Sequence, residues 1–400
     1  MMVPFRCLYS GLVALFGKKR YNKSTFDALV VEAPSRWALS SEDAFDGVTW
    51  EQVEDATRAL ATVTVGSFAG ERVTGGNGRH VSIHYRLYDT LDEKHGYVVI
   101  VAGFTEAVAL YQEAIYDFVR NGFSVYAYDH RGQGFSSRLL EGEWNADKGH
   151  VDSFDHLVSD LDRFIALVRR RRASRSGRMH ILANSMGGAV VSLYMSTVDS
   201  LSASVAMIAP MHQIKLGFWT SLLLSSRVLR MLLPLASSVR VHGGDFTTGE
   251  ACFSSLTALS DNEMSHSMSR LRRRWSARRA TWTDASGDRH DARISGVTLR
   301  WLVDAFDAAR RSRRQSGSRY VASHDRVLCP TMLLQAEHDD VVDANGQCAY
   351  WRGANATRAG SCLAFCVAGA RHLILHEVDA YRNPALGAVM SFFASNNQTQ

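Results

Sequence analysis

Residues 179–194 read Met-His-Ile-Leu-Ala-Asn-Ser-Met-Gly-Gly-Ala-Val-Val-Ser-Leu-Tyr, an apolar run, a short turn and a second apolar run in direct succession. The turn 183–188 follows the small-x-Ser-x-Gly pattern, with Ala183 at the position where glycine is usual. A serine between a buried strand and a helix sits on a strained elbow, with its hydroxyl beside the helix N-terminus. We therefore predict that Ser185 is a nucleophile, and the alternative is a structural helix cap.

Further apolar runs accompany this strand along the chain, and they cover residues 97–101, 124–128, 204–208, 330–334 and 363–367. A helical repeat of apolar residues lies between the second run and the elbow, at 154–168. Wholly apolar strands that alternate with helices are typical of a parallel sheet covered on both faces. The sequence thus predicts an α/β fold with a mostly parallel central sheet.

The pattern also predicts a domain organisation. The repeat begins after a hairpin signal around the glycines at 75–78, breaks at Pro210 and resumes at Pro330. We predict a core of residues 66–210 and 327–396, an inserted helical cap of residues 211–326, and an N-terminal extension of residues 1–65.

A nucleophilic serine needs a general base and an orienting acid, which follow it in that fold in the order serine, acid, histidine. His372 lies in the segment that follows the last apolar run, whereas His376 is expected on a following turn. Asp339, Asp340 and Asp343 follow the preceding run, and Asp339 is placed best. We predict Asp339 and His372 as the acid and the base.

Backbone N–H groups are expected to stabilise an oxyanion at such a site because they are fixed before the reaction. The N–H of Met186 follows the nucleophile directly, and the N–H of Phe104 lies in the loop after the first parallel strand. The alternative for this loop is an ordinary turn between a strand and a helix.

The insertion carries two features that suggest how a substrate is bound. Apolar stretches at 216–224 and 228–233 would line an acyl channel or dip into a bilayer surface, or they are ordinary core packing. Two arginine clusters follow, formed by Arg270, Arg272, Arg273, Arg274, Arg278 and Arg279 and then by Arg310, Arg311, Arg313 and Arg314. Guanidinium groups match phosphate, although such runs are more often solvated helix faces.

Composition and charge exclude some classes of protein. The chain has 400 residues, a net charge of +5 and six cysteines without metal-ligand spacing. Residues 211–326 hold 19 Lys and Arg against 10 Asp and Glu, which favours a local anionic partner and not a nucleic acid. The apolar run near the N-terminus is shorter than the roughly 20 residues of a spanning helix. We expect a cytoplasmic protein, with a membrane-surface contact or organellar targeting by residues 1–65 left open.

Five ordered motifs together resemble the monoacylglycerol lipase and lysophospholipase branch of the α/β hydrolases, most of all the bacterial inner-membrane lysophospholipases. The resemblance covers residues 66–396, and its motifs are Asp129-His130-Arg131-Gly132-Gln133-Gly134 with Ser136, Gly149-His150-Val151 with Phe154, Ser185-Met186-Gly187-Gly188, Ala209-Pro210-Met211 and Gln335-Ala336-Glu337. Asn184 and the pair Ala102-Gly103 differ from the His and His-Gly of that branch.

The resemblance implies the same residues as the patterns: the triad Ser185, Asp339 and His372, with the Phe104 and Met186 N–H groups as the oxyanion hole. It implies a serine hydrolase without metal or cofactor that cleaves the ester of a single-chain lipid, first a lysophospholipid and second a monoacylglycerol. Two other readings stay open, a catalytically silent scaffold of the same fold and an acyltransferase.

Overall fold

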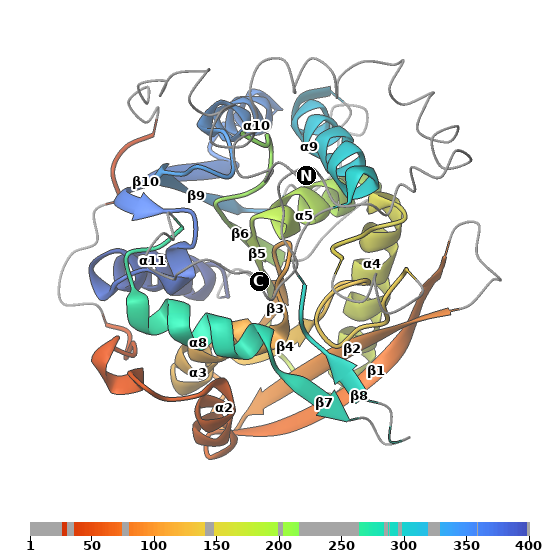
Figure 1. Ribbon diagram of the computed structural model, residues 1–400. Coiled ribbons are helices and arrows are strands. Elements are labelled where there is room, and N and C mark those ends of the chain that lie inside the picture. The colour runs from red at the N-terminus through yellow and green to blue at the C-terminus, as the bar shows by residue number, and fades with distance from the viewer. Residues whose placement is uncertain are drawn as a thin grey trace, which may run out of the picture.

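The central feature of the fold is an eight-stranded sheet in the order β1-β2-β4-β3-β5-β6-β9-β10 (Figure 1). The structure is a computed structural model that describes residues 26–29, 36–73, 80–140, 148–198, 203–215, 264–283, 287, 289–294, 298–318, 329–357 and 359–397. The strands of the sheet are β1 Ala61–Arg72, β2 His80–Thr90, β3 Tyr97–Val101, β4 Ser124–Tyr128, β5 Met179–Asn184, β6 Ala203–Ile208, β9 Thr331–His338 and β10 Cys362–Arg371.

Neighbouring strands run parallel along the series β4, β3, β5, β6, β9 and β10. Strands β1 and β2 form an antiparallel hairpin at one edge, and β2 pairs antiparallel with β4. These strand directions confirm the predicted mostly parallel sheet. Its wholly apolar strands need cover on both faces. Strand β5 continues two residues beyond the predicted end at Leu182, since Ala183 and Asn184 still pair with β6.

Helices cover both faces of the sheet (Figure 1). They are α2 Trp50–Arg58, α3 Gln112–Arg120, α4 Phe154–Arg171, α5 Met186–Thr197, α8 Met268–Arg278, α9 Leu299–Ser318, α10 Ala344–Thr357 and α11 Asp379–Asn397, with single turns η1 Asp43–Phe45, η2 Val108–Tyr111 and η7 Ile374–His376. One buried core joins the sheet to α4, α5, α9 and α10, for example through Leu161 and Val190. A second core joins the other face to α2, α3, α8 and α11, for example through Phe118 and Phe393.

The described part of the predicted N-terminal extension packs on the second core. Trp37 and Trp50 are buried there, and α2 begins with a capping box at Thr49. Strand β1 starts at Ala61, five residues before the predicted start of the core. Residues 1–25 lie outside the described part, and so does the apolar run near the N-terminus for which a membrane-surface contact or organellar targeting is left open.

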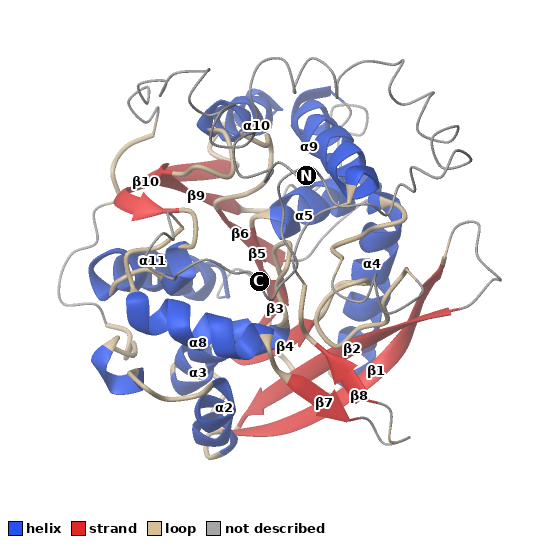
Figure 2. Cartoon of the chain, in the orientation of Figure 1, coloured by secondary structure: helices blue, strands red, loops and turns tan. Residues whose placement is uncertain are grey.

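The described part of the predicted insertion supplies α8, α9 and the two-stranded sheet of β7 Thr281–Thr283 and β8 Arg289–Asp291, which lies near the hairpin edge (Figure 2). Both apolar stretches, 216–224 and 228–233, lie outside the described residues. Where the structure describes the chain, no helix has the length and apolar character needed to span a bilayer.

Candidate active site

Ser185 occupies a strained turn between β5 and α5. Its backbone has φ 49° and ψ −113°, in a region that residues with a side chain rarely adopt. Three hydrogen bonds hold the turn: the Ser185 N–H donates to the Ile208 carbonyl at 2.9 Å, and the Ser185 carbonyl accepts from Gly188 at 2.9 Å and from Met211 at 2.8 Å. The end of β6 and the following loop therefore fix the elbow that the sequence predicts.

Glycines after the serine allow the helix to approach the sheet. A Cβ at Gly187 would lie 2.2 Å from the Val101 carbonyl oxygen, and a Cβ at Gly188 would lie 2.4 Å from the Pro210 Cβ. Because the first obstacle is backbone, it cannot move aside as a flexible side chain could. The glycines of the motif are thus required by close packing against β3 and the loop after β6.

The structure brings the three predicted triad residues together. His372 follows β10, and its Nε2 lies 3.0 Å from Ser185 Oγ. Its Nδ1 lies 2.8 Å from Asp339 Oδ2, and Asp339 Oδ1 accepts from the N–H groups of Val341 and Val342 at 2.9 Å each. The serine, aspartate and histidine side chains are all buried. The turn after β9 thus orients the carboxylate toward the imidazole.

The alternative acids and the second histidine lie elsewhere. The Asp340 carboxylate pairs with Lys215 Nζ at 2.6 Å. Asp343 accepts from a backbone N–H at the start of α10. His376 lies on the turn η7, as expected, with its Nε2 2.9 Å from the Leu110 carbonyl oxygen.

In the loop after β3, the N–H groups on either side of Phe104 have side-chain acceptors. The N–H of Gly103 donates to Glu106 Oε2 at 2.6 Å, and the N–H of Thr105 donates to the Gln133 side-chain oxygen. Between them, the Phe104 N–H donates to no group of the described residues. Thr105 has φ 58°, so the loop is held in a strained conformation.

The second predicted donor is Met186, the first residue of α5. The N–H groups in the first turn of a helix have no partner within it, and they carry the positive end of the helix dipole. Because β3 and β5 are parallel neighbours, with Val101 opposite Ala183, the loop and the elbow lie at the same sheet edge. Both predicted oxyanion donors thus follow the carboxyl ends of adjacent strands.

Aromatic side chains from the core and the insertion meet beside this loop. The rings of Phe104 and Trp301, on α9, have centroids 4.0 Å apart. The Thr298 N–H donates to the Gly149 carbonyl oxygen at 3.0 Å, and His150 Nδ1 lies 2.9 Å from Thr298 Oγ1. The start of α9 is thus tied to the Gly149-His150 motif, which brings insertion residues to the wall of the site.

Sequence reasoning assigned no role to Glu106, which is buried in this loop. Burial alone would raise the pKa of its carboxyl group, but the Arg274 charge and hydrogen bonds from Tyr111 and Asn184 outweigh burial and lower the pKa to about 2. The carboxyl group is therefore ionised at neutral pH. A signal existed in the sequence, an acidic residue in an otherwise neutral loop, but its partner Arg274 is far along the chain.

The prediction for the first arginine cluster is wrong at three positions. Arg270, Arg273 and Arg274 are buried, and their guanidinium groups pair with the carboxylates of Glu113 and Glu106. They are neither a solvated face nor free to bind phosphate, because buried charges require partners. In the second cluster, Arg310 pairs with Asp307 and Arg311 with Asp155 on α4.

The Asp129 to Gly134 segment is held in place by buried polar contacts. Asp129 accepts from the N–H groups of Val108 and Phe135 at 2.6 and 2.7 Å. Arg131 is buried and pairs with Asp160 at 2.7 Å. Among the described residues, no group of three or more His, Cys, Asp or Glu side chains could hold a metal ion.

Comparisons with known proteins identify the family of the chain. The family model described as serine aminopeptidase, S33 (Hydrolase_4) matches residues 92–379. The chain is 29% identical to lysophospholipase L2 of Escherichia coli K12 over 351 residues, which is 87% of this chain and 95% of that protein. It is 24% identical to the probable lysophospholipase L2 of Haemophilus influenzae over 318 residues, 78% of this chain and 89% of that protein.

Solved structures share the fold at lower identity. A soluble variant of the Saccharomyces cerevisiae monoglyceride lipase is 15% identical with a TM-score of 0.57, over 84% of this chain and 98% of its own. A carboxyl esterase from Bacillus coagulans is 16% identical with a TM-score of 0.59, over the same shares of the two chains. The chain therefore belongs to the Hydrolase_4 family, has the α/β-hydrolase fold, and is a carboxylic ester hydrolase similar to lysophospholipases L2.

Proposed function

We propose that this protein hydrolyses the carboxylic ester of a single-chain lipid through an acyl-enzyme on Ser185. His372 takes the proton of the Ser185 hydroxyl, and Oγ attacks the ester carbonyl carbon. Collapse of the tetrahedral intermediate expels the alcohol, which takes the proton from His372. Water activated by the same imidazole then attacks the acyl-enzyme and releases the fatty acid.

The other predicted residues act on charge that develops during these steps. Asp339 holds the imidazole in the tautomer that presents a bare Nε2 to the serine, and it stabilises the imidazolium. The N–H groups of Phe104 and Met186 donate to the oxyanion of the tetrahedral intermediate. Donors that are fixed before the reaction cost no reorganisation when the charge appears, so they lower the barrier.

One observation carries the proposal: an unbroken chain of contacts from Asp339 Oδ2 through His372 to Ser185 Oγ, at 2.8 and 3.0 Å. A structural serine at a helix start would instead use its hydroxyl to cap the first turn, and the Ser185 side chain makes no such cap. The same chain of contacts argues against a silent scaffold.

The first choice of substrate is a lysophospholipid, because the relatives matched over 351 and 318 residues are named lysophospholipase L2 and probable lysophospholipase L2. A monoacylglycerol is the second choice because part of the first arginine cluster is not available to bind a phosphate. Arg270, Arg273 and Arg274 are neutralised by carboxylates within the protein, so this half of the cluster offers no charge to a phosphate. We also propose that residues 211–326 act as a cap over the acyl chain and that the cap or residues 1–65 contact the membrane surface.

The test is fatty-acid release from lysophosphatidylcholine and from monoacylglycerol, measured side by side for the native chain and Ser185→Ala. We expect release from the lysophospholipid to exceed release from the monoacylglycerol and to vanish in the variant. Preference for the monoacylglycerol would select the second substrate. Release that persists in Ser185→Ala would refute the mechanism, and new esters formed with added alcohols in place of fatty acid would identify an acyltransferase.

A further inference from the structure

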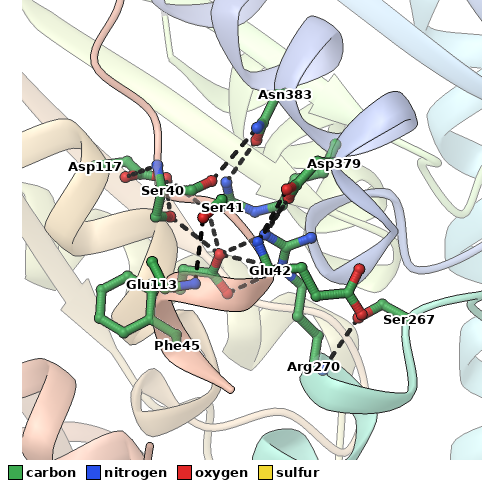
Figure 3. A network of polar contacts seen from close by, with 12 residues as sticks. Ser40, Ser41, Glu42, Phe45, Glu113, Asp117, Ser267, Arg270, Asp379 and Asn383 are labelled. Carbon is green, nitrogen blue, oxygen red and sulfur yellow. Dashed lines mark hydrogen bonds and ion pairs between the residues drawn. The ribbon is translucent and has the colours of Figure 1, made fainter.

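Helix α8 is anchored to the core by a network of charged side chains, in which Arg270 and Glu113 are buried (Figure 3). Arg270 donates to the Glu113 carboxylate on α3 at 2.7 to 3.0 Å and to Asp379 on α11 at 2.7 Å. Ser267, the cap of α8, donates to Glu42 at 2.6 Å, and the Glu42 N–H in turn donates to Asp379. Burial raises the cost of breaking such contacts, so α8 is a fixed part of the body of the enzyme.

The next turn of α8 brings a charge to the loop after β3. Arg274 Nη1 lies 2.9 Å from Glu106 Oε1, and the two side chains are only 9% and 2% exposed. Since Arg270 and Arg273 fix the helix, Arg274 cannot easily move away from this carboxylate. The insertion is therefore joined to the loop that carries the predicted oxyanion donor.

The other oxygen of Glu106 gathers three donors from separate elements. Oε2 accepts from the Gly103 N–H at 2.6 Å, from the Tyr111 hydroxyl, and from Asn184 Nδ2 at 3.1 Å. Gly103 precedes Phe104, and Asn184 precedes Ser185, so one carboxylate contacts the residue before each of two proposed site residues. A Cβ at Gly103 would lie 2.6 Å from Glu106 Oε2, so glycine is needed for this approach.

We propose that Glu106 is a positioning residue, held by Arg274 of α8, that fixes the spacing between the Phe104 N–H and the nucleophile elbow. The inference rests on the proposed function, because it assigns Glu106 to the oxyanion hole of that mechanism. Its carboxylate is suited to the task because it only accepts hydrogen bonds, and its partners are three hydrogen-bond donors and the Arg274 cation. Asn184 supplies the donor on the elbow at the position where the related branch has histidine.

The chemistry predicts the effect of Glu106→Gln. Glutamine has one acceptor oxygen and one NH2 group. Either the Arg274 guanidinium or the three hydrogen-bond donors must therefore face the NH2 group, which is itself a donor. The loop then shifts relative to Ser185, and transition-state stabilisation is lost while substrate binding is not. We expect kcat for a short-chain p-nitrophenyl ester to fall by about tenfold to a hundredfold, with little change in KM, since loss of a whole oxyanion donor costs about 10² to 10³.

A second substitution separates positioning from simple destabilisation. In Glu106→Gln with Arg274→Met, the amide NH2 no longer faces a cation, so its oxygen is free for the three donors. We expect this double variant to recover at least part of the lost kcat.

The matched control is the buried pair of Glu54 and Arg86, whose side chains are each 5% exposed. Glu54→Gln and Arg86→Met should lower the melting temperature without lowering kcat.

The outcomes are distinct. Loss of kcat in Glu106→Gln at constant KM, absent from the Glu54 control and relieved by Arg274→Met, supports positioning by Glu106. Equal kcat in Glu106→Gln and the native chain, or equal losses in both pairs, overturns this inference while Ser185-dependent activity of the native chain keeps the proposed function. If the native chain shows no Ser185-dependent hydrolysis, both proposals fail together.

Discussion

Replacement of Asp339 by asparagine isolates the step that prepares the nucleophile. Asp339 Oδ1 accepts two backbone N–H groups at 2.9 Å, so the asparagine oxygen will keep that position and its NH2 will face His372 Nδ1. The imidazole must then carry its proton on Nε2, 3.0 Å from Ser185 Oγ, where it cannot accept the serine proton. The equivalent change in a serine protease lowers kcat about 10⁴-fold, which is about 5 kcal/mol of barrier.

The assay is steady-state hydrolysis of a short-chain p-nitrophenyl ester, with far-ultraviolet circular dichroism and thermal melting as checks on folding. Asp340→Asn is the matched control, because Asp340 is adjacent in sequence but pairs with Lys215. We expect a loss of about 10⁴ for Asp339→Asn and almost none for Asp340→Asn. Comparable losses in the two variants, or a folded Asp339→Asn enzyme with nearly native kcat, would refute the assignment of the acid.

Three further predictions concern packing, buried charge and pH. Gly187→Ala places a Cβ 2.2 Å from a backbone oxygen, so we expect kcat/KM to fall at least about a hundredfold, and a nearly native value would contradict the packing argument. Arg131→Met leaves Asp160 buried without its partner, so urea unfolding should show a loss of about 3 to 5 kcal/mol; an unchanged midpoint would refute this. Burial lowers the pKa of His180 and His376 to about 4, from 6.5 in the unfolded chain, so the unfolded state binds protons first as pH falls. The free energy of unfolding should therefore decrease from pH 6.5 toward pH 4 by about 1.4 kcal/mol per pH unit for each histidine, and a pH-independent value there would contradict it.

The parts of the fold that the sequence predicts are those with a local signature. Buried parallel strands appear as wholly apolar runs, and the elbow at Ser185 needs small residues that the sequence displays. The order of serine, acid and histidine along the chain then selected His372. The choice among Asp339, Asp340 and Asp343 depended on the turn after the strand, where the backbone N–H groups of Val341 and Val342 hold the Asp339 carboxylate.

The parts that the sequence does not predict depend on pairs that are distant along the chain. Arg270 and Arg274 look like a solvated run, because nothing nearby indicates that Glu113 and Glu106 meet them in the interior. The same limit explains why Glu106 had no assigned role. The N-terminal region shows the same limit. Its apolar residues have no clear helical or strand spacing, yet it packs into the second core through large side chains such as Trp50.

The central claim, that Ser185 is the nucleophile of an ester hydrolase, is tested most directly by covalent labelling. The native chain, Ser185→Ala and His372→Ala would be treated with an alkyl fluorophosphonate and analysed by intact-protein and peptide mass spectrometry. We expect one adduct on the native chain, located on the peptide that contains Ser185, none on Ser185→Ala, and much slower labelling of His372→Ala. Labelling of Ser185→Ala to the same extent, or an adduct on another residue of the native chain, would contradict the account.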